Sequence, residues 1–157
     1  MKKNLATALG FVLNDEGGFA IRDAEPGGAV NKGVSFLVFT EWRKRNGQPP
    51  PQFDDLRDIT TEEAMAIYET LYAKPIGFDD LPAGLDYAML NAAVMEGVNG
   101  AKKLLDRSGP DPMMLLLAQA AKKMRSKSVT KFGGGWGDRL LRVANRVGEM
   151  THDPKMV

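Results

Sequence analysis

Glu16 is the residue of this sequence best placed to act as a catalytic acid. It follows a segment with helical spacing and stands directly before Gly17 and Gly18. Because the carbonyl groups that end a helix carry partial negative charge, they disfavour an ionised carboxylate beside them. Phe19 is expected to exclude water from the same carboxyl group, which acts in the same direction. A glutamate that keeps its proton near neutral pH is what a glycosidase requires of its general acid.

The stretch around this glutamate, residues 14–35, reads NDEGGFAIRDAEPGGAVNKGVS. Its glycines lose more conformational freedom on folding than any other residue type, so their concentration indicates a backbone that passes close to a partner. Turn chemistry in a small hairpin would account for the same glycines. On position alone, an exposed side chain that merely ends a helix is the simpler interpretation of Glu16.

The composition leaves carboxylates as the obvious acid–base groups, with tyrosine and lysine as the less favoured alternatives. Cysteine is absent and His152 is the single histidine, which argues against disulfides, thiolate metal sites, a Ser-His-Asp triad and a histidine-rich metal site. Lys+Arg 21 against Asp+Glu 20 leaves a net charge of +1, so no nucleic-acid partner is expected. At 157 residues and 43% hydrophobic content, the chain fits one domain with a core.

The elements that must position Glu16 are predicted to be mainly helical. The first segment, MKKNLATALGFVL, resembles a signal peptide but is short and lacks a convincing cleavage site, so we expect it to form the first helix. Residues 17–34 are predicted to form a loop or small hairpin. Further helices are predicted after Ser35, after Thr60, from about Pro82, over 99–107, from Pro112, and after a glycine-rich turn near residues 132–137.

Three of these helices carry recognisable start signals. Ser35 is expected to cap a helix in which Phe36, Phe39 and Trp42 face inward. Thr60 and the glutamate three residues later have the spacing of a capping box. Asp111 precedes a proline at the first helical position, a favoured arrangement.

Four segments, in order along the chain, resemble glycoside hydrolase family 108, which comprises lysozyme-like N-acetylmuramidases, many of them phage endolysins. The first combines EGGF at 16–19 with PGG at 26–28, Asn31 and Gly33. The other three read DITTEEAMAIYETLY, DDLPAGLDYAMLNAAV and FGGGWGDRLLRV. The resemblance implies a mainly helical, lysozyme-like domain over 1–157 with an irregular hairpin at the cleft. Within it, 1–97 would be the catalytic part and 98–157 a C-terminal, peptidoglycan-binding part.

The resemblance implies that Glu16 protonates the glycosidic oxygen between N-acetylmuramic acid and N-acetylglucosamine. The second acidic position of the family falls on Glu25, with Asp23 as the other candidate, and would activate water or stabilise the oxocarbenium-like transition state. The expected substrate-binding residues are Gly17, Gly18, Phe19, Asn31, Tyr72, Asn91 and Trp136. Trp136 is equally consistent with a buried anchor for the last helix, and Tyr68 is expected in the core. No metal or cofactor is expected.

Several positions depart from the family pattern, and they concentrate where the resemblance implies the sugar groove. Val30 replaces a threonine, Ala73 a tryptophan and Asn91 an aspartate, while Met95 replaces an asparagine. These departures leave open a homologue with altered or lost catalysis that binds peptidoglycan, or one that serves as a structural protein of a phage or secretion system.

The expected partner is bacterial peptidoglycan, without stable insertion into a membrane. Without a clear signal peptide, the chain is expected to be made in the cytoplasm and to act in the periplasm or cell wall after a holin or secretion machinery releases it. One basic cluster is notable, and it comprises Lys122, Lys123, Arg125, Lys127 and Lys131. It would attract an anionic surface, although a solvated helix end with favourable dipole contacts is the simpler interpretation.

Overall fold

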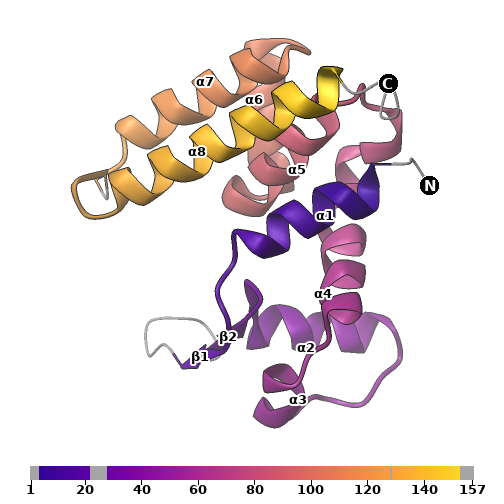
Figure 1. Ribbon diagram of the computed structural model, residues 1–157. Coiled ribbons are helices and arrows are strands. Elements are labelled where there is room, and N and C mark those ends of the chain that lie inside the picture. Colours follow the sequence, from indigo (N-terminus) through magenta and orange to yellow (C-terminus); the bar gives the residue numbers. More distant parts are fainter. Residues whose placement is uncertain (1–3, 22–27, 128, 153–157) are drawn as a thin grey trace. The chain divides into compact units, whose positions relative to one another are not determined.

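The computed structural model describes residues 4–21, 28–127 and 129–152. Within these ranges it contains eight α-helices and a three-stranded antiparallel sheet, which confirms the predicted mainly helical fold with a small hairpin. Figure 1 follows the chain through these elements. The backbone divides into two compact units, one of residues 9–70 and one of residues 1–8 with 71–157. The division into a catalytic and a C-terminal part at residue 97 stays a prediction.

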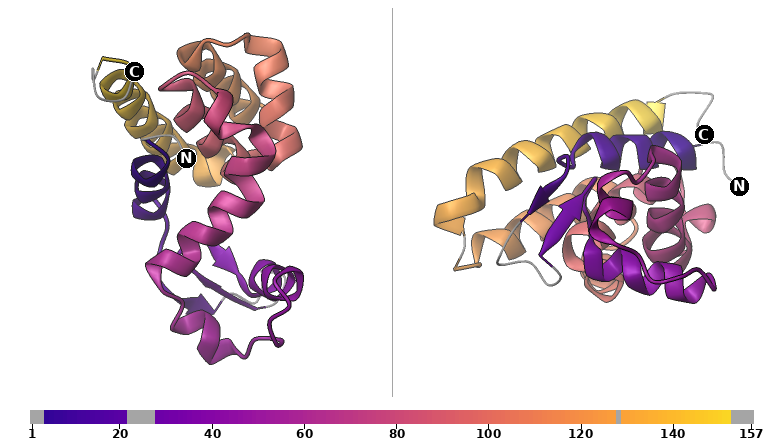
Figure 2. Two further views of the ribbon diagram at one scale, coloured as in Figure 1. Left: turned by 90° about the vertical axis from the view of Figure 1, so that its right-hand side faces the viewer. Right: turned by 90° about the horizontal axis from the view of Figure 1, so that it is seen from below.

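The unit of residues 9–70 contains the sheet. Strands β1 (Ala20–Ile21), β2 (Ala29–Asn31) and β3 (Val34–Ser35) pair antiparallel in that order. The register sets Ala20 opposite Val30 and Asn31 opposite Val34. Helices α2 (Phe36–Arg45), α3 (Phe53–Arg57) and α4 (Thr61–Tyr68) follow the sheet. Helix α2 contacts β3 and α3 contacts β2, and Figure 2 shows both helices beside the strands.

The predicted start signals set the first residues of these helices. The Ser35 hydroxyl accepts a hydrogen bond from the backbone N–H of Val38 at 3.3 Å. Thr60 and Glu63 form the predicted capping box, each side chain accepting from the other residue's backbone N–H. Because these bonds satisfy backbone donors that have no partner inside the helix, they specify where α2 and α4 begin.

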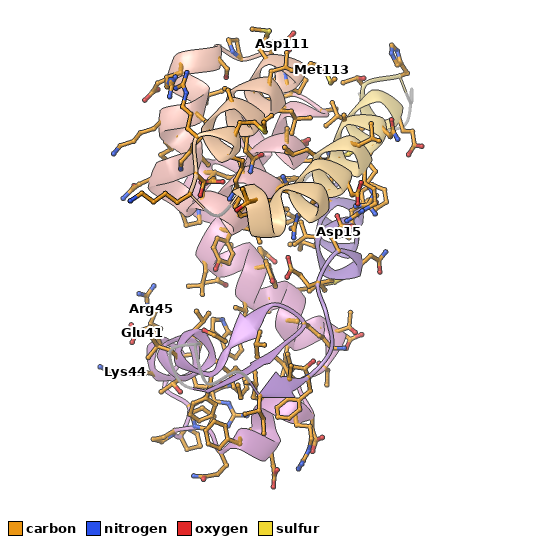
Figure 3. The ribbon with its side chains drawn as sticks, turned by 90° about the vertical axis from the view of Figure 1, so that its left-hand side faces the viewer. Asp15, Glu41, Lys44, Arg45, Asp111 and Met113 are labelled. Carbon is orange, nitrogen blue, oxygen red and sulfur yellow. The ribbon has the colours of Figure 1, made fainter. Side chains whose placement is uncertain are left out.

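The two faces of α2 differ strongly in polarity. Phe39 and Trp42 are buried, as predicted, whereas Phe36 is half-buried. Glu41, Lys44 and Arg45 lie on the exposed face, where Figure 3 shows them. The Glu41 carboxylate accepts from the Arg45 guanidinium at 2.9 Å, four residues further along. The apolar face of α2 therefore packs against the core while its charged face contacts solvent.

Helix α3 was not predicted, because its five residues follow a run of prolines that indicates a chain break. Its first turn carries its own cap: the backbone N–H of Gln52 donates to the Asp55 carboxylate at 2.7 Å. Leu56 is fully buried. A helix this short shows no periodicity in the sequence and depends on contacts with α2 and β2.

The other unit is built around α5 (Leu85–Glu96). Every residue from Leu85 to Ala93 is buried, because α6 (Val98–Ser108), α7 (Pro112–Met124) and α8 (Val129–His152) pack around it. The 3₁₀ segments Lys74–Ile76 and Phe78–Asp80 contact it as well. Asp111 caps α7 as predicted, its carboxylate accepting from the Met114 N–H at 2.8 Å. A mostly apolar helix suits this central position, and its buried polar residues make hydrogen bonds.

The prediction of a glycine-rich turn near residues 132–137 is wrong. Helix α8 runs without interruption from Val129 to His152 and includes these glycines. Each glycine in a helix interior costs about 1 kcal/mol relative to alanine, but α8 buries Val143, Val147 and Met150 against the rest of the unit. Packing with α5 and α7 along this long helix overrides the local preference of the glycines.

The first helix, α1 (Leu5–Asn14), confirms the prediction for the start of the chain. Its Leu5, Ala8, Leu9 and Val12 are buried, while Leu13 is half-buried. Just before it, the buried Asn4 side chain donates a hydrogen bond to the fully buried carboxylate of Asp86 in α5. The same carboxylate accepts from the backbone N–H of Tyr87 at 2.7 Å. These bonds satisfy an acid that would otherwise be costly to bury.

Candidate active site

Glu16 lies directly after α1, at the helix end that the sequence predicts. The backbone N–H of Glu16 bonds to the carbonyl of Leu13 at 3.1 Å, and that of Asp15 bonds to Val12 at 3.1 Å. These bonds close the last turn, and the chain leaves the helix before Gly17. The Glu16 side chain is half-buried. The end of α1 thus presents this carboxyl group at the surface of the unit of residues 9–70.

The turn between β2 and β3 has a conformation that few residues adopt. Asn31 pairs with Val34, so Lys32 and Gly33 form a two-residue hairpin loop. Both have positive φ, 48° at Lys32 and 73° at Gly33. Positive φ at both loop positions is the type I′ arrangement, whose twist matches that of the flanking strands. Glycine at the second position adopts this conformation without the strain that a side chain would add.

Gly33 also lies where the Glu16 carboxyl and the Tyr68 hydroxyl converge. A Cβ atom at residue 33 would overlap the Tyr68 hydroxyl and stand only 2.7 Å from a Glu16 carboxyl oxygen. Since real Cβ atoms do not approach other atoms so closely, no residue other than glycine fits here without a shift. Gly33 itself is exposed. The three residues therefore form a compact acid–hydroxyl site at the surface.

Tyr68 connects this site to the hairpin. Its side chain is 2% exposed, which agrees with the expectation of a core residue. Its hydroxyl nevertheless donates to the backbone carbonyl of Lys32 at 3.1 Å, across the sheet from α4. No sequence signal links residues 16, 33 and 68, because they meet only through the pairing of β2 with β3 and the packing of α4. Sequence reasoning therefore missed Tyr68 as a site residue.

Asn31 holds the hairpin against α3. Its side chain is 6% exposed, and its amide group donates to the carbonyl of Leu56 at 3.1 Å and to that of Arg57 at 2.8 Å. Both N–H groups of the Asn31 side chain are thus used within the fold. A contact between this residue and the substrate stays a prediction.

The segment after Glu16 is open to solvent. Gly17 and Gly18 are exposed, and a Cβ at either position would have no atom within 4 Å. Phe19 is 36% exposed and lines a pocket of about 340 Å³ together with Ile21, Phe53 and Arg57, among others. Substrate contacts at residues 17–19 stay a prediction. The two candidates for the second carboxylate, Asp23 and Glu25, lie outside the described residues.

The remaining predicted site residues belong to the unit of residues 1–8 and 71–157. Tyr72 is half-buried in the π-helical segment Glu69–Ala73. Asn91 is buried in α5 and accepts a hydrogen bond from the Arg139 Nε of α8 at 3.0 Å. Trp136 of α8 is half-buried, with the Lys123 ammonium 4.6 Å from its ring centroid. Asn91 and Trp136 thus both take part in contacts of α8, and their roles toward substrate stay predictions.

Residues 9–97 match the sequence profile of the family described as glycosyl hydrolase 108. The chain belongs to this family. It is also similar to the solved structure of Brucella abortus SagA, with 28% identity and a TM-score of 0.80 over 96% of this chain and 97% of that chain. Comparison with curated proteins finds no matching sequence.

Membership of the glycosyl hydrolase 108 family confirms the resemblance seen in the sequence and identifies the fold as lysozyme-like. The matched residues include Glu16, Gly33 and Tyr68. Of the departures from the family pattern, Ala73 is 1% exposed, so a tryptophan there would need space that neighbouring side chains occupy. Val30 and Met95 are half-buried.

The described ranges contain neither a cluster of metal ligands nor a membrane-spanning helix. Among residues 4–21, 28–127 and 129–152, no three His, Cys, Asp or Glu side chains gather closely enough to hold a metal ion. Over the same ranges, no helix combines the length and the apolar character that crossing a bilayer requires.

Proposed function

We propose that this glycosyl hydrolase is an N-acetylmuramidase that cleaves the bond between N-acetylmuramic acid and N-acetylglucosamine in peptidoglycan. Glu16 is the general acid that protonates the glycosidic oxygen. The observation that carries this proposal is the convergence of the Glu16 carboxyl and the Tyr68 hydroxyl on Gly33, at an exposed turn of the family-matched segment. A half-buried carboxyl held at the surface is accessible to substrate yet restricted in position, as general acid catalysis requires.

In this mechanism Tyr68 is a positioning residue. Its hydroxyl is fixed by the Lys32 carbonyl at 3.1 Å and occupies the side of Gly33 that the Glu16 carboxyl also occupies. It therefore limits the positions available to the acid. The assisting carboxylate is Glu25 or Asp23. Its separation from the Glu16 carboxyl determines whether hydrolysis inverts or retains the configuration at the anomeric carbon.

We also propose that the substrate is the bacterial cell wall, reached in the periplasm with the help of a holin or of secretion machinery. This follows from the substrate that a muramidase requires. Neither a metal nor a cofactor takes part in the proposed steps, because paired carboxylates suffice for glycoside hydrolysis.

Turnover of purified peptidoglycan by the wild type and by Glu16→Gln tests the proposal. The wild type is expected to release muropeptides with new reducing muramic ends. Glu16→Gln keeps the shape of the side chain but cannot donate a carboxyl proton, so release is expected to fall by roughly 10²-fold or more. Glu62→Gln, an exposed acid in the first turn of α4, is the charge-matched control and should keep wild-type turnover.

Equal release by the wild type and Glu16→Gln would remove Glu16 from its role. No release by either, from several wall types, would favour a homologue that binds peptidoglycan without cleaving it. Tyr68→Phe refines the test, because it removes only the hydroxyl. We expect a lower kcat with little change in KM and an altered pH–rate profile, which a purely structural role of Tyr68 would not produce.

A further inference from the structure

Helices α6 and α7 enclose a groove of about 400 Å³ that the proposed chemistry at Glu16 does not use. The two helices contact each other. The groove lies wholly within the unit of residues 1–8 and 71–157. Its lining consists of Gly100, Lys103, Leu104, Asp106, Arg107 and Lys122.

The charges that line this groove are mostly positive. Lys103 and Arg107 are four residues apart on α6 and are both exposed, so they lie on the same helix face. Neither makes an ion pair within 4.0 Å with any residue in the described ranges. Like charges at this spacing destabilise a helix, and among the described residues that line the groove only Asp106 is acidic. The groove thus holds positive charge that the described fold does not compensate.

A third cation faces the groove from α7. The Lys122 ammonium is held 2.5 Å from a carboxyl oxygen of Glu96, while Lys123 pairs with the other oxygen at 2.7 Å. The Glu96 carboxylate therefore pairs with two lysines. About half of the Lys122 side chain remains exposed at the groove. The sequence contains no acid from Pro112 to Gly137, so α7 brings no further negative charge to this wall.

We propose that the groove between α6 and α7 binds carboxylate groups of peptidoglycan stem peptides, through Arg107, Lys103 and Lys122. The proposal rests on the proposed function for its substrate. The planar guanidinium of Arg107 can bind a carboxylate with two parallel hydrogen bonds, and the two ammonium groups supply further donors. The apolar wall from Gly100 and Leu104 leaves room for the aliphatic part of a peptide. The site holds the polymer while Glu16 acts on its glycan.

Binding of the full-length chain to purified peptidoglycan tests this site. All variants carry Glu16→Gln so that cleavage does not alter the ligand, and the bound fraction is measured by co-sedimentation. Lys103→Gln with Arg107→Gln should weaken binding by about tenfold or more, as expected for loss of charge-assisted hydrogen bonds. The charge-conserving pair Lys103→Arg with Arg107→Lys should retain most of the binding. Circular dichroism of each variant verifies that it is folded.

The matched control removes two cations that do not line the groove. Lys102→Gln with Lys127→Gln makes the same change in net charge, and both lysines are exposed. Wild-type binding by this control supports a defined site, whereas an equal loss in both double variants would overturn it in favour of diffuse attraction. Peptidoglycan whose carboxyl groups have been amidated should bind weakly. If it binds as well as the native polymer, carboxylate recognition is refuted.

These readouts are separate from turnover. A chain that releases no muropeptides but binds native peptidoglycan better than amidated peptidoglycan would overturn the muramidase proposal and support the groove. Conversely, normal release together with unchanged binding by the Lys103 and Arg107 double variant would overturn the groove and leave the muramidase proposal standing.

Discussion

Replacing Gly33 by alanine should both destabilise the protein and displace the Glu16 carboxyl. The backbone at residue 33 has φ +73°, a conformation that costs a residue with a side chain about 1–2 kcal/mol. The added methyl group would overlap the Tyr68 hydroxyl and crowd the Glu16 carboxyl, and overpacking of this kind costs roughly 1–3 kcal/mol. Allowing for the reduced freedom of the unfolded chain, we expect the free energy of unfolding to fall by about 2–4 kcal/mol.

Three other glycines separate the two contributions. Gly28 has φ +74° but open space around its Cα, so Gly28→Ala should show the backbone cost alone, about 1 kcal/mol. Gly84 has φ +85°, and a Cβ there would overlap a methyl group of Thr151, so Gly84→Ala should lose about as much stability as Gly33→Ala. Gly10 lies within α1 with ordinary φ and open space, and Gly10→Ala should stabilise by about 0.5–1 kcal/mol.

Urea unfolding gives the free energy of unfolding of each variant. Peptidoglycan turnover is then measured under conditions in which all variants are folded. Only Gly33→Ala should lose kcat, by roughly 10- to 100-fold, because a small displacement of a catalytic group has effects of this size. If Gly33→Ala unfolds like Gly28→Ala, the overlap at residue 33 is refuted. If it is destabilised as expected but turns over at the wild-type rate, the position of the Glu16 carboxyl does not matter and the proposed mechanism fails.

Two further predictions concern stability. Asn31→Ala removes the side-chain donors to the carbonyls of Leu56 and Arg57, although the Leu56 carbonyl keeps a bond from the Ile59 N–H at 3.4 Å. The free energy of unfolding should fall by about 1–3 kcal/mol in urea; a loss below 0.5 kcal/mol, roughly the level of a surface substitution, would contradict this role. For Glu96, burial raises the pKa, but hydrogen bonds from Lys122 and Lys123 outweigh it and hold the pKa below the ordinary 4.5. Because the pKa of Glu96 is lower in the folded than in the unfolded chain, its ionised carboxylate stabilises the fold at pH values above the unfolded-state pKa. This stabilisation is lost as the pH falls through the folded-state pKa. Glu96→Gln should therefore cost about 1–2 kcal/mol near pH 7 and flatten the fall in stability below about pH 4.5; an identical pH dependence of both proteins would refute the lysine pairing.

Signals confined to a few neighbouring residues predicted most of the helices correctly. Ser35, Thr60 and Asp111 each cap a helix where predicted, because a cap is a local hydrogen bond that depends on residues within one turn. The same locality explains the two errors. Helix α3 is too short to show a period. In α8 the glycines are the local signal and favour a turn, whereas the packing that keeps them helical involves other helices of the unit.

The sequence by itself limited the acid–base groups available to this protein and located the proposed acid. With no cysteine and one histidine, carboxylates remain, and the glycines after Glu16 end α1 where its carboxyl becomes accessible. Only the tertiary structure decided what surrounds that carboxyl. Tyr68 belongs to α4 and Gly33 to a type I′ turn. Strand pairing and helix packing place both beside Glu16, although they are far from it in the sequence. The cationic groove arises in the same way, because the residues of α6 and α7 become neighbours only when both helices pack around α5.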